Sequence, residues 1–150
     1  MQKFKNKFKA LTLIELLAVI AIMGVLASIS AGFIRAYQPN IKLYTETRQL
    51  HEALEEARSR TIAEQQAYGV RFFREQGRYE LVSLEGAGTV IGAYTLPNEV
   101  WFASIAAFEN DTAQFNKAGA ARESGDVALQ NSNSDQRTVS INPSGYIETK

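Results

Sequence analysis

The residues that enzymes use as nucleophiles and bases are scarce in this chain. His51 is the single histidine among 150 residues, and cysteine is absent. A serine triad needs a histidine held by an acid, and a thiol nucleophile needs a cysteine. The sequence therefore does not supply the residues for either kind of catalysis. We interpret His51 as a surface or packing residue and expect no enzymatic activity and no cofactor.

Two further spacings resemble ligand sites but depart from them. Gly86, Gly88 and Gly92 miss the spacing of a dinucleotide-binding loop and lack a strand-helix-strand setting, so we expect a flexible loop there. A second set alternates as the oxygen ligands of a calcium loop do, but a glutamine stands where that loop needs glycine. We interpret this set as a polar loop without a metal: Asn131, Asn133, Asp135 and Gln136.

Glu15 is the only charged residue in an apolar run from Leu11 to Ile34. The uncharged part, residues 16–34, would span roughly 28 Å as a helix, which matches the hydrocarbon thickness of a bilayer. Four lysines precede the run, at positions 3, 5, 7 and 9, and only Arg35 follows it closely. This bias predicts a transmembrane helix at 11–34 with its N-terminus in the cytoplasm and the rest of the chain outside.

Two ordinary interpretations of this segment stay open. One is a cleaved secretory signal peptide with small residues near Ala27 and Ala31, which would release a secreted domain. The other is a plain signal anchor. Both leave Glu15 unexplained, although a carboxylate in a membrane helix costs about 2.5–3.5 kcal/mol at the helix centre and less near its start.

The residues Lys9 to Leu17, KALTLIELL, look like the type III signal of type IV prepilins and pseudopilins. The resemblance implies that a prepilin peptidase cuts between Ala10 and Leu11, and that the new amine of Leu11 is methylated. It also implies that Thr12 and Glu15 serve assembly, with Glu15 as the glutamate that is fifth after the cut. The family usually has glycine before the cut and phenylalanine after it, where this chain has alanine and leucine.

The chemistry of a paired carboxylate fits this implied role. A cut chain would begin with a largely cationic amine, because a free α-amino group ordinarily has a pKa of about 7.7–8. In a filament of staggered helices, Glu15 of one subunit can face the terminal amine of its neighbour. The charge is then tolerable when paired and unfavourable when unpaired, so the pair can set the register between subunits.

Helical periodicity resumes beyond the apolar run, in residues 35–66. Pro39 is expected to kink or briefly break the helix, and the helix is expected to end near residues 65–66. Residues spaced three and four apart predict one buried face, which comprises Leu43, Thr47, Leu50, Leu54, Ala57 and Thr61.

Short strand patterns follow in residues 67–150. The segments 68–74 and 78–84 flank Glu75-Gln76-Gly77 and predict a hairpin. Further strands are expected at 99–103, 113–115, 126–130, 138–141 and 146–147. The pattern predicts a small β-rich domain with an antiparallel sheet, which uses the helix as one wall because its own core is small.

This C-terminal part is similar to the GspH/FimT group of minor pseudopilins and minor pilins. The resemblance lies in residues 96–102, 115–119, 125–129, 139–141 and 144–147. It implies an α+β, pilin-like fold: a leader at 1–10, a transmembrane helix at 11–34, the soluble half of the same helix at 35–66, and an antiparallel domain at 67–150.

The two resemblances together predict a minor pseudopilin of a type II secretion or type IV pilus-like filament, in the inner membrane and with its C-terminal domain in the periplasm. The implied partners are other pilin subunits, prepilin peptidase, the membrane and, indirectly, the assembly platform and its ATPase. An alternative is a minor pilin that binds DNA or a surface. Nucleic acid is not expected as a partner, because residues 11–150 hold 12 basic and 16 acidic residues.

Overall fold

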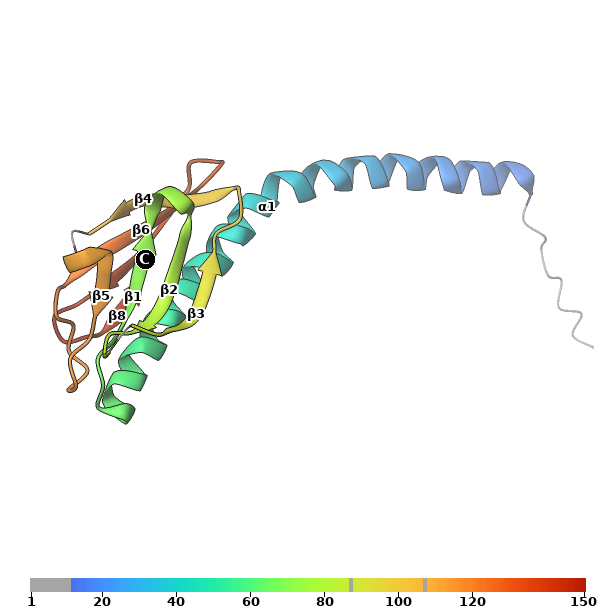
Figure 1. Cartoon of the computed structure of the whole chain (residues 1–150). Helices are drawn as coiled ribbons and strands as arrows, with labels where there is room; N and C mark the ends of the chain where they lie inside the picture. Colours follow the sequence, from blue (N-terminus) through green and yellow to red (C-terminus); the bar gives the residue numbers. More distant parts are fainter. Residues whose placement is uncertain (1–11, 87, 107) are drawn as a thin grey trace, which may run out of the picture. The chain divides into compact units, whose positions relative to one another are not determined.

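The computed structural model describes residues 12–86, 88–106 and 108–150, with only the backbone described at 29–36. The chain divides into two compact units, Met1–Tyr37 and Gln38–Lys150. One long helix, α1 (Leu13–Glu64), begins in the first unit and ends in the second (Figure 1).

In the first unit, the described side chains of α1 are exposed, and apart from Glu15 and Ser28 they are almost all apolar. Leu13, Ile14 and Met23 are among the most exposed large hydrophobic residues of the described chain. A helix that is apolar around its whole circumference is normally buried by other helices or by lipid. Within the described residues, no helix combines the length and hydropathy that crossing a membrane requires. The transmembrane segment expected at 11–34 therefore stays a prediction.

In the second unit, α1 buries one face, and it is the face expected from the periodicity. All six residues of that prediction are buried, and Ala53 joins them. The two threonines on this face satisfy their hydroxyl groups locally, because Thr47 Oγ1 donates to the carbonyl of Leu43 at 2.6 Å and Thr61 Oγ1 to that of Ala57 at 2.8 Å. Thr61 Oγ1 also accepts the backbone N–H of Tyr68 at 3.1 Å, which ties the end of the helix to the first strand.

Of the two outcomes expected at Pro39, a kink or a brief break of the helix, the break is absent. The backbone stays helical on both sides of Pro39. A proline removes one backbone donor, and the hydrogen bonds of the neighbouring turns are sufficient to continue the helix. The helix ends at Glu64 because Gln65 adopts a left-handed conformation with φ of 54°, a common conformation just after a helix.

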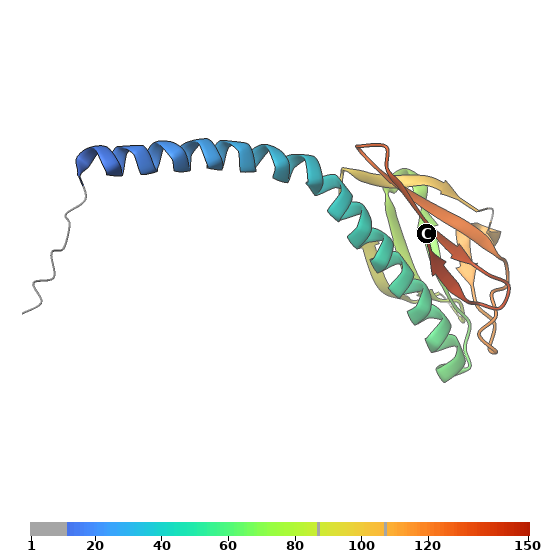
Figure 2. The same ribbon diagram turned by 180° about the vertical axis from the view of Figure 1, so that it is seen from behind.

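Among the described residues, eight strands form two four-stranded antiparallel sheets beside the second half of α1 (Figures 1 and 2). The first sheet has the order β3-β2-β1-β5, and the second has the order β4-β6-β7-β8. The first sheet consists of β1 (Tyr68–Phe73), β2 (Arg78–Ser83), β3 (Val90–Thr95) and β5 (Thr112–Gln114). The second sheet consists of β4 (Val100–Ile105), β6 (Gly125–Asn131), β7 (Gln136–Ile141) and β8 (Ile147–Thr149).

The expected hairpin is confirmed. β1 and β2 pair in antiparallel register with Phe73 opposite Arg78, and a short 3-10 helix, η1 (Arg74–Gln76), joins them. Gly77 ends η1 with φ of +57°, a conformation that glycine adopts without strain. The expected α+β class, a long helix with antiparallel strands, is also confirmed.

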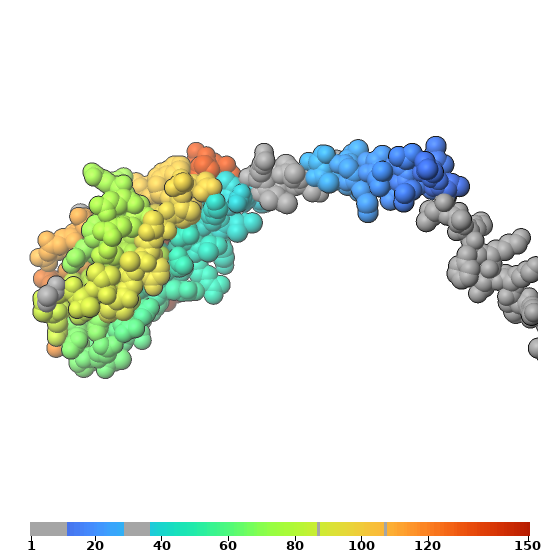
Figure 3. All heavy atoms as spheres, turned by 45° about the vertical axis from the view of Figure 1, so that its right-hand side comes forward, coloured from blue at the N-terminus to red at the C-terminus, as the bar shows by residue number. Residues whose placement is uncertain are grey.

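Two features of the sheets differ from the expectation. The strands form two sheets where one was expected, because β4 pairs with β6 and not with a strand of the first sheet. Residues 90–95 form β3, although Gly92 was expected in a flexible loop. β3 lies at the edge of its sheet and on the surface of the second unit (Figure 3), so it lacks the hydrophobic alternation that reveals a half-buried strand.

One hydrophobic core joins both sheets to α1. It includes Leu50 and Leu54 of the helix, Val70 and Leu81 of the first sheet, and Leu129 of the second. The helix thus covers apolar side chains from both sheets, as expected for a β-rich domain too small to bury its own core.

Candidate functional site

Glu15 lies in the first turn of α1 and exchanges hydrogen bonds with Thr12. The backbone N–H and the hydroxyl of Thr12 both donate to Glu15 Oε2, each at 2.9 Å. The backbone N–H of Glu15 donates back to Thr12 Oγ1 at 3.3 Å. This reciprocal arrangement is a capping box, which satisfies two of the backbone donors that the start of a helix leaves unpaired.

The capping box fixes the position of the Glu15 carboxylate. The helix N-terminus carries a partial positive charge, so a carboxylate is stabilised there. Both hydrogen bonds that the described residues donate to this carboxylate end on Oε2. Oε1 accepts no hydrogen bond from the described residues. A group outside the described residues can therefore bind Oε1 without breaking the cap.

The structure brings together two of the four residues that the resemblance singled out. Thr12 and Glu15 lie side by side, whereas Ala10 and Leu11 lie outside the described residues, so the cut and the methylation stay predictions. The capping role of the pair was missed. A threonine three residues before a glutamate at the start of an apolar run is a sequence signal for it.

The polar loop at 131–135 is a hydrogen-bonded turn between β6 and β7. Asn131 is fully buried, and its Oδ1 accepts the backbone N–H groups of Asn133 at 3.0 Å and Asp135 at 2.9 Å. Its Nδ2 donates to Asn40 Oδ1 of α1 at 2.6 Å. The oxygen that a calcium ion would need is therefore used by the turn, and in the described part of the chain no three His, Cys, Asp or Glu side chains form a metal-binding group.

His51 lies on α1 and contacts the last strand. Its Nδ1 and the hydroxyl of Thr149 share a hydrogen bond of 3.1 Å. No acid is bonded to the ring among the described residues, so the triad geometry is not formed there. The hydrogen bond agrees with the interpretation of His51 as a surface or packing residue.

Two family models match this chain and together cover most of it. The prokaryotic N-terminal methylation motif matches residues 5–31. The model of the type II transport protein GspH matches residues 46–145. No curated protein sequence is detectably similar.

Solved structures of minor pseudopilins and minor pilins share the fold. The minor pseudopilin EpsH from the type 2 secretion system of Vibrio cholerae superposes with a TM-score of 0.63 at 12% identity, over 73% of this chain and 96% of EpsH. The type IV minor pilin FimU of Pseudomonas aeruginosa superposes with a TM-score of 0.61 at 14% identity, over 79% of this chain and 92% of FimU.

Proposed function

The chain belongs to the family of the type II transport protein GspH, and we propose that it is a minor pseudopilin that enters a secretion filament through its N-terminal helix. The family expected from the two resemblances is confirmed. The observation that supports this function best is Glu15, held by Thr12 at the head of an apolar, exposed helix inside a methylation motif.

Processing is the first step of the proposed function. Prepilin peptidase removes residues 1–10 by cutting between Ala10 and Leu11, and the exposed amine of Leu11 is methylated. Before assembly the apolar part of the helix, residues 11–34, anchors the chain in the inner membrane, with the four leader lysines in the cytoplasm and the second unit in the periplasm. The assembly platform and its ATPase then move the subunit into the filament.

Assembly uses the carboxylate of Glu15. Oε2 stays with Thr12 and keeps the helix start formed, while Oε1 accepts the amine of a neighbouring subunit. An ion pair of this kind is directional and much stronger in an apolar environment than in water. The apolar side chains on all sides of the helix pack against other pilin-like helices, so the subunit works as a structural component and not as an enzyme.

N-terminal sequencing and mass spectrometry of the protein from its native membrane test the processing. We expect a chain that begins at methylated Leu11. A chain that begins at Met1, or one that begins near Ala31 and is released into the medium, would contradict the proposal and favour an unprocessed anchor or an ordinary signal peptide.

Two variants at the helix start separate the charge of Glu15 from its capping role. Glutamine can replace glutamate in a capping box but has no charge, so Glu15→Gln keeps the cap and removes the ion pair. Thr12→Ala removes the cap, at about 1 kcal/mol of local helix stability, and keeps the charge. We expect Glu15→Gln to lower filament incorporation about tenfold or more, and Thr12→Ala to lower it less.

Incorporation can be measured as the fraction of processed protein that cofractionates with sheared filaments. Membrane insertion, checked by carbonate extraction, serves as the control and should stay unchanged in both variants. If Glu15→Gln assembles as well as the unaltered chain, the ion-pair role is wrong.

A further inference from the structure

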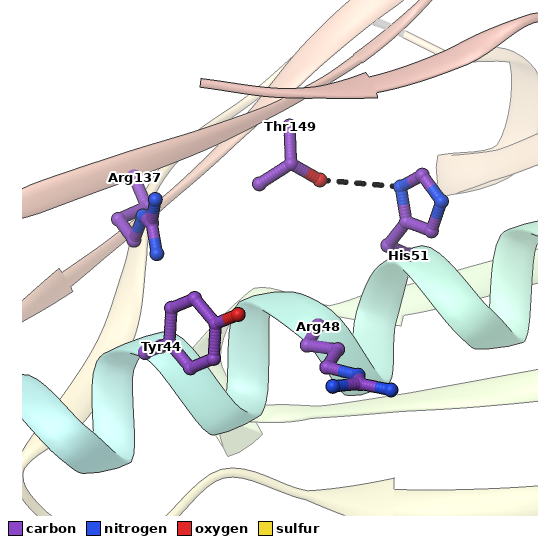
Figure 4. Close-up of a pocket in the computed structure, with 5 residues that line it drawn as sticks. All are labelled: Tyr44, Arg48, His51, Arg137 and Thr149. Atoms are coloured by element: carbon purple, nitrogen blue, oxygen red, sulfur yellow. Dashed lines mark hydrogen bonds between the residues drawn. The ribbon is translucent and has the colours of Figure 1, made fainter.

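A groove lies between α1 and the two last strands of the second sheet. Tyr44, Arg48 and His51 line it from the helix, Arg137 from β7 and Thr149 from β8, around a volume of about 250 Å³ (Figure 4). We name it the α1–β8 groove. All five residues belong to the second unit, and the function proposed above uses none of them.

The groove is lined by cationic and neutral side chains without an acid. Arg137 lies over the ring of Tyr44, with its guanidinium carbon 4.9 Å from the ring centre. In the described chain Arg137 forms no ion pair, whereas most of the other arginines of the second unit contact a carboxylate or a carbonyl. Its N–H donors are thus available to a ligand, and the stacking on Tyr44 holds the group in place.

Arg48 is a second donor at the same groove. Its Nε donates to Glu52 Oε1 at 2.9 Å, and this hydrogen bond does not involve the two terminal nitrogens of the guanidinium. The hydroxyl of Thr149 and the ring of His51, which bond to each other, lie at the other side of the groove. A planar acceptor in the groove would find the guanidinium of Arg137 at one end and Thr149 and His51 at the other.

The size and the charge of the groove select the ligand. Guanidinium groups bind carboxylates through two parallel hydrogen bonds. A volume of 250 Å³ is below the roughly 300–1,000 Å³ of pockets for drug-sized molecules, which suits one acidic side chain better than a nucleotide. The excess of acidic residues in 11–150 also opposes the approach of a polyanion such as DNA.

We propose that the α1–β8 groove binds the carboxylate of an acidic side chain from a neighbouring protein subunit. That the occupant is a subunit rests on the proposed function, whereas the preference for a carboxylate rests on the groove itself. Among the described strands, β8 is the edge strand of its sheet and pairs with β7, and Glu148 and Thr149 are exposed, so a partner can reach the groove along β8. The contact would add a second attachment between subunits, made by the second unit and separate from the N-terminal helix.

The ligand chemistry can be tested with the full chain in detergent micelles. N-acetyl-glutamate amide is the probe, because it carries one side-chain carboxylate, and N-acetyl-glutamine amide is its neutral control. Free glutarate and inorganic phosphate distinguish a peptide side chain from a free anion. NMR shifts of the arginine Nε–H groups and of the Thr149 backbone amide report binding.

We expect the glutamate probe to bind saturably and the neutral probe not to bind. Arg137→Gln should weaken binding about tenfold or more, since a hydrogen bond to a charged group contributes about 1.5–3 kcal/mol. The matched control is Arg122→Gln, because Arg122 is exposed and its ion pair with Glu109, at 3.1 Å, lies outside the groove. Equal weakening by both variants, equal shifts with the neutral probe, or tighter binding of phosphate would overturn the carboxylate site.

The source of the carboxylate is tested by assembly in cells. We expect the double variant Arg48→Gln/Arg137→Gln to lower filament incorporation several-fold. The cut before Leu11 should still occur, and the thermal unfolding midpoint of the double variant should equal that of the Arg122→Gln control. Incorporation equal to that control would overturn the subunit contact. If the unaltered chain never enters filaments, the proposed function fails together with the subunit contact, while the titration still decides whether the groove binds carboxylates.

Discussion

Tyr79 places a phenolic hydroxyl inside the core of the second unit. The side chain is fully buried, and among the described residues its hydroxyl has no hydrogen-bond partner. Its ring stacks on Tyr94 with 5.0 Å between the centroids and meets the edge of Phe102 at 6.5 Å. Burial raises the pKa of Tyr79, because the charged phenolate would be desolvated. The ring of Tyr79 therefore stabilises the core, whereas burial of its hydroxyl destabilises the folded state.

Tyr79→Phe is expected to raise the free energy of unfolding by about 1 kcal/mol, because it keeps the ring contacts and removes a buried polar group without a partner. Urea unfolding followed by circular dichroism measures the change. A matched substitution is Tyr94→Phe, which alters the other ring of the same stack. A loss of stability in Tyr79→Phe would show that the hydroxyl is hydrogen-bonded in solution.

At the scale of elements, two turns that lie far apart in the sequence meet beside α1. Gly145, in the turn before β8, has φ of +81°, and a β-carbon there would overlap the carbonyl oxygen of Gly119. Arg58 of α1 donates from Nε to that same carbonyl at 2.9 Å. The glycine-containing segments that resemble the GspH/FimT group therefore form one contact between a loop, the last hairpin and the helix.

Gly145→Ala is expected to lower the free energy of unfolding by about 2 kcal/mol or more, because the added methyl group is strained in this conformation and also overlaps backbone. Gly86→Ala is a useful comparison. Gly86 also has a positive φ, of +67°, but a β-carbon there meets no atom within 4 Å, so only the conformational cost remains. Thermal unfolding should rank the two variants in that order, and equal midpoints would contradict the close contact.

At the scale of the whole chain, two glutamates couple the packing of α1 to pH in opposite directions. Lys42 of α1 donates to Glu99 Oε1 at 2.7 Å, just before β4, and this hydrogen bond is the main reason that the pKa of Glu99 is lowered. Glu46 lies on the same helix, and burial raises its pKa. A carboxyl group whose pKa is lowered by folding stabilises the fold at pH values above its unfolded-state pKa, and this stability is lost as the pH falls through its folded-state pKa. A carboxyl group whose pKa is raised by folding stabilises the fold at pH values below its unfolded-state pKa, and this stability is lost as the pH rises through its folded-state pKa.

The two substitutions should therefore differ in sign at neutral pH. We expect Glu99→Gln to destabilise the protein at pH 7 and to have a smaller effect at pH 3, because the stability that the paired carboxylate contributes is lost as the pH falls. Glu46→Gln should stabilise it at pH 7 and have little effect at pH 3. Urea midpoints at both pH values test this, and a destabilised Glu46→Gln protein at pH 7 would contradict the assigned burial of Glu46.

Local patterns were enough to predict much of the fold. The helical face from Leu43 to Thr61 and the hairpin around Gly77 were both confirmed, because each depends on residues only a few positions apart. The methylation motif is equally local, and its family was confirmed as well. In the first unit the structure adds the hydrogen bonds between Thr12 and Glu15, while the cut, the methylation and the transmembrane helix stay predictions.

Only the tertiary structure decided how the strands pair and how the last hairpin packs on α1. These contacts join residues far apart in the sequence, which no short-range hydrophobic pattern can relate. The choice of β6 as the partner of β4 separates the strands into two sheets, and the edge strand β3 is defined by its pairing with β2 and not by its own hydrophobicity. Arg137 and Thr149 come to lie beside Tyr44 and Arg48 only when the last hairpin packs on α1. The α1–β8 groove could not be foreseen from the sequence, since its lining comes from positions about a hundred residues apart.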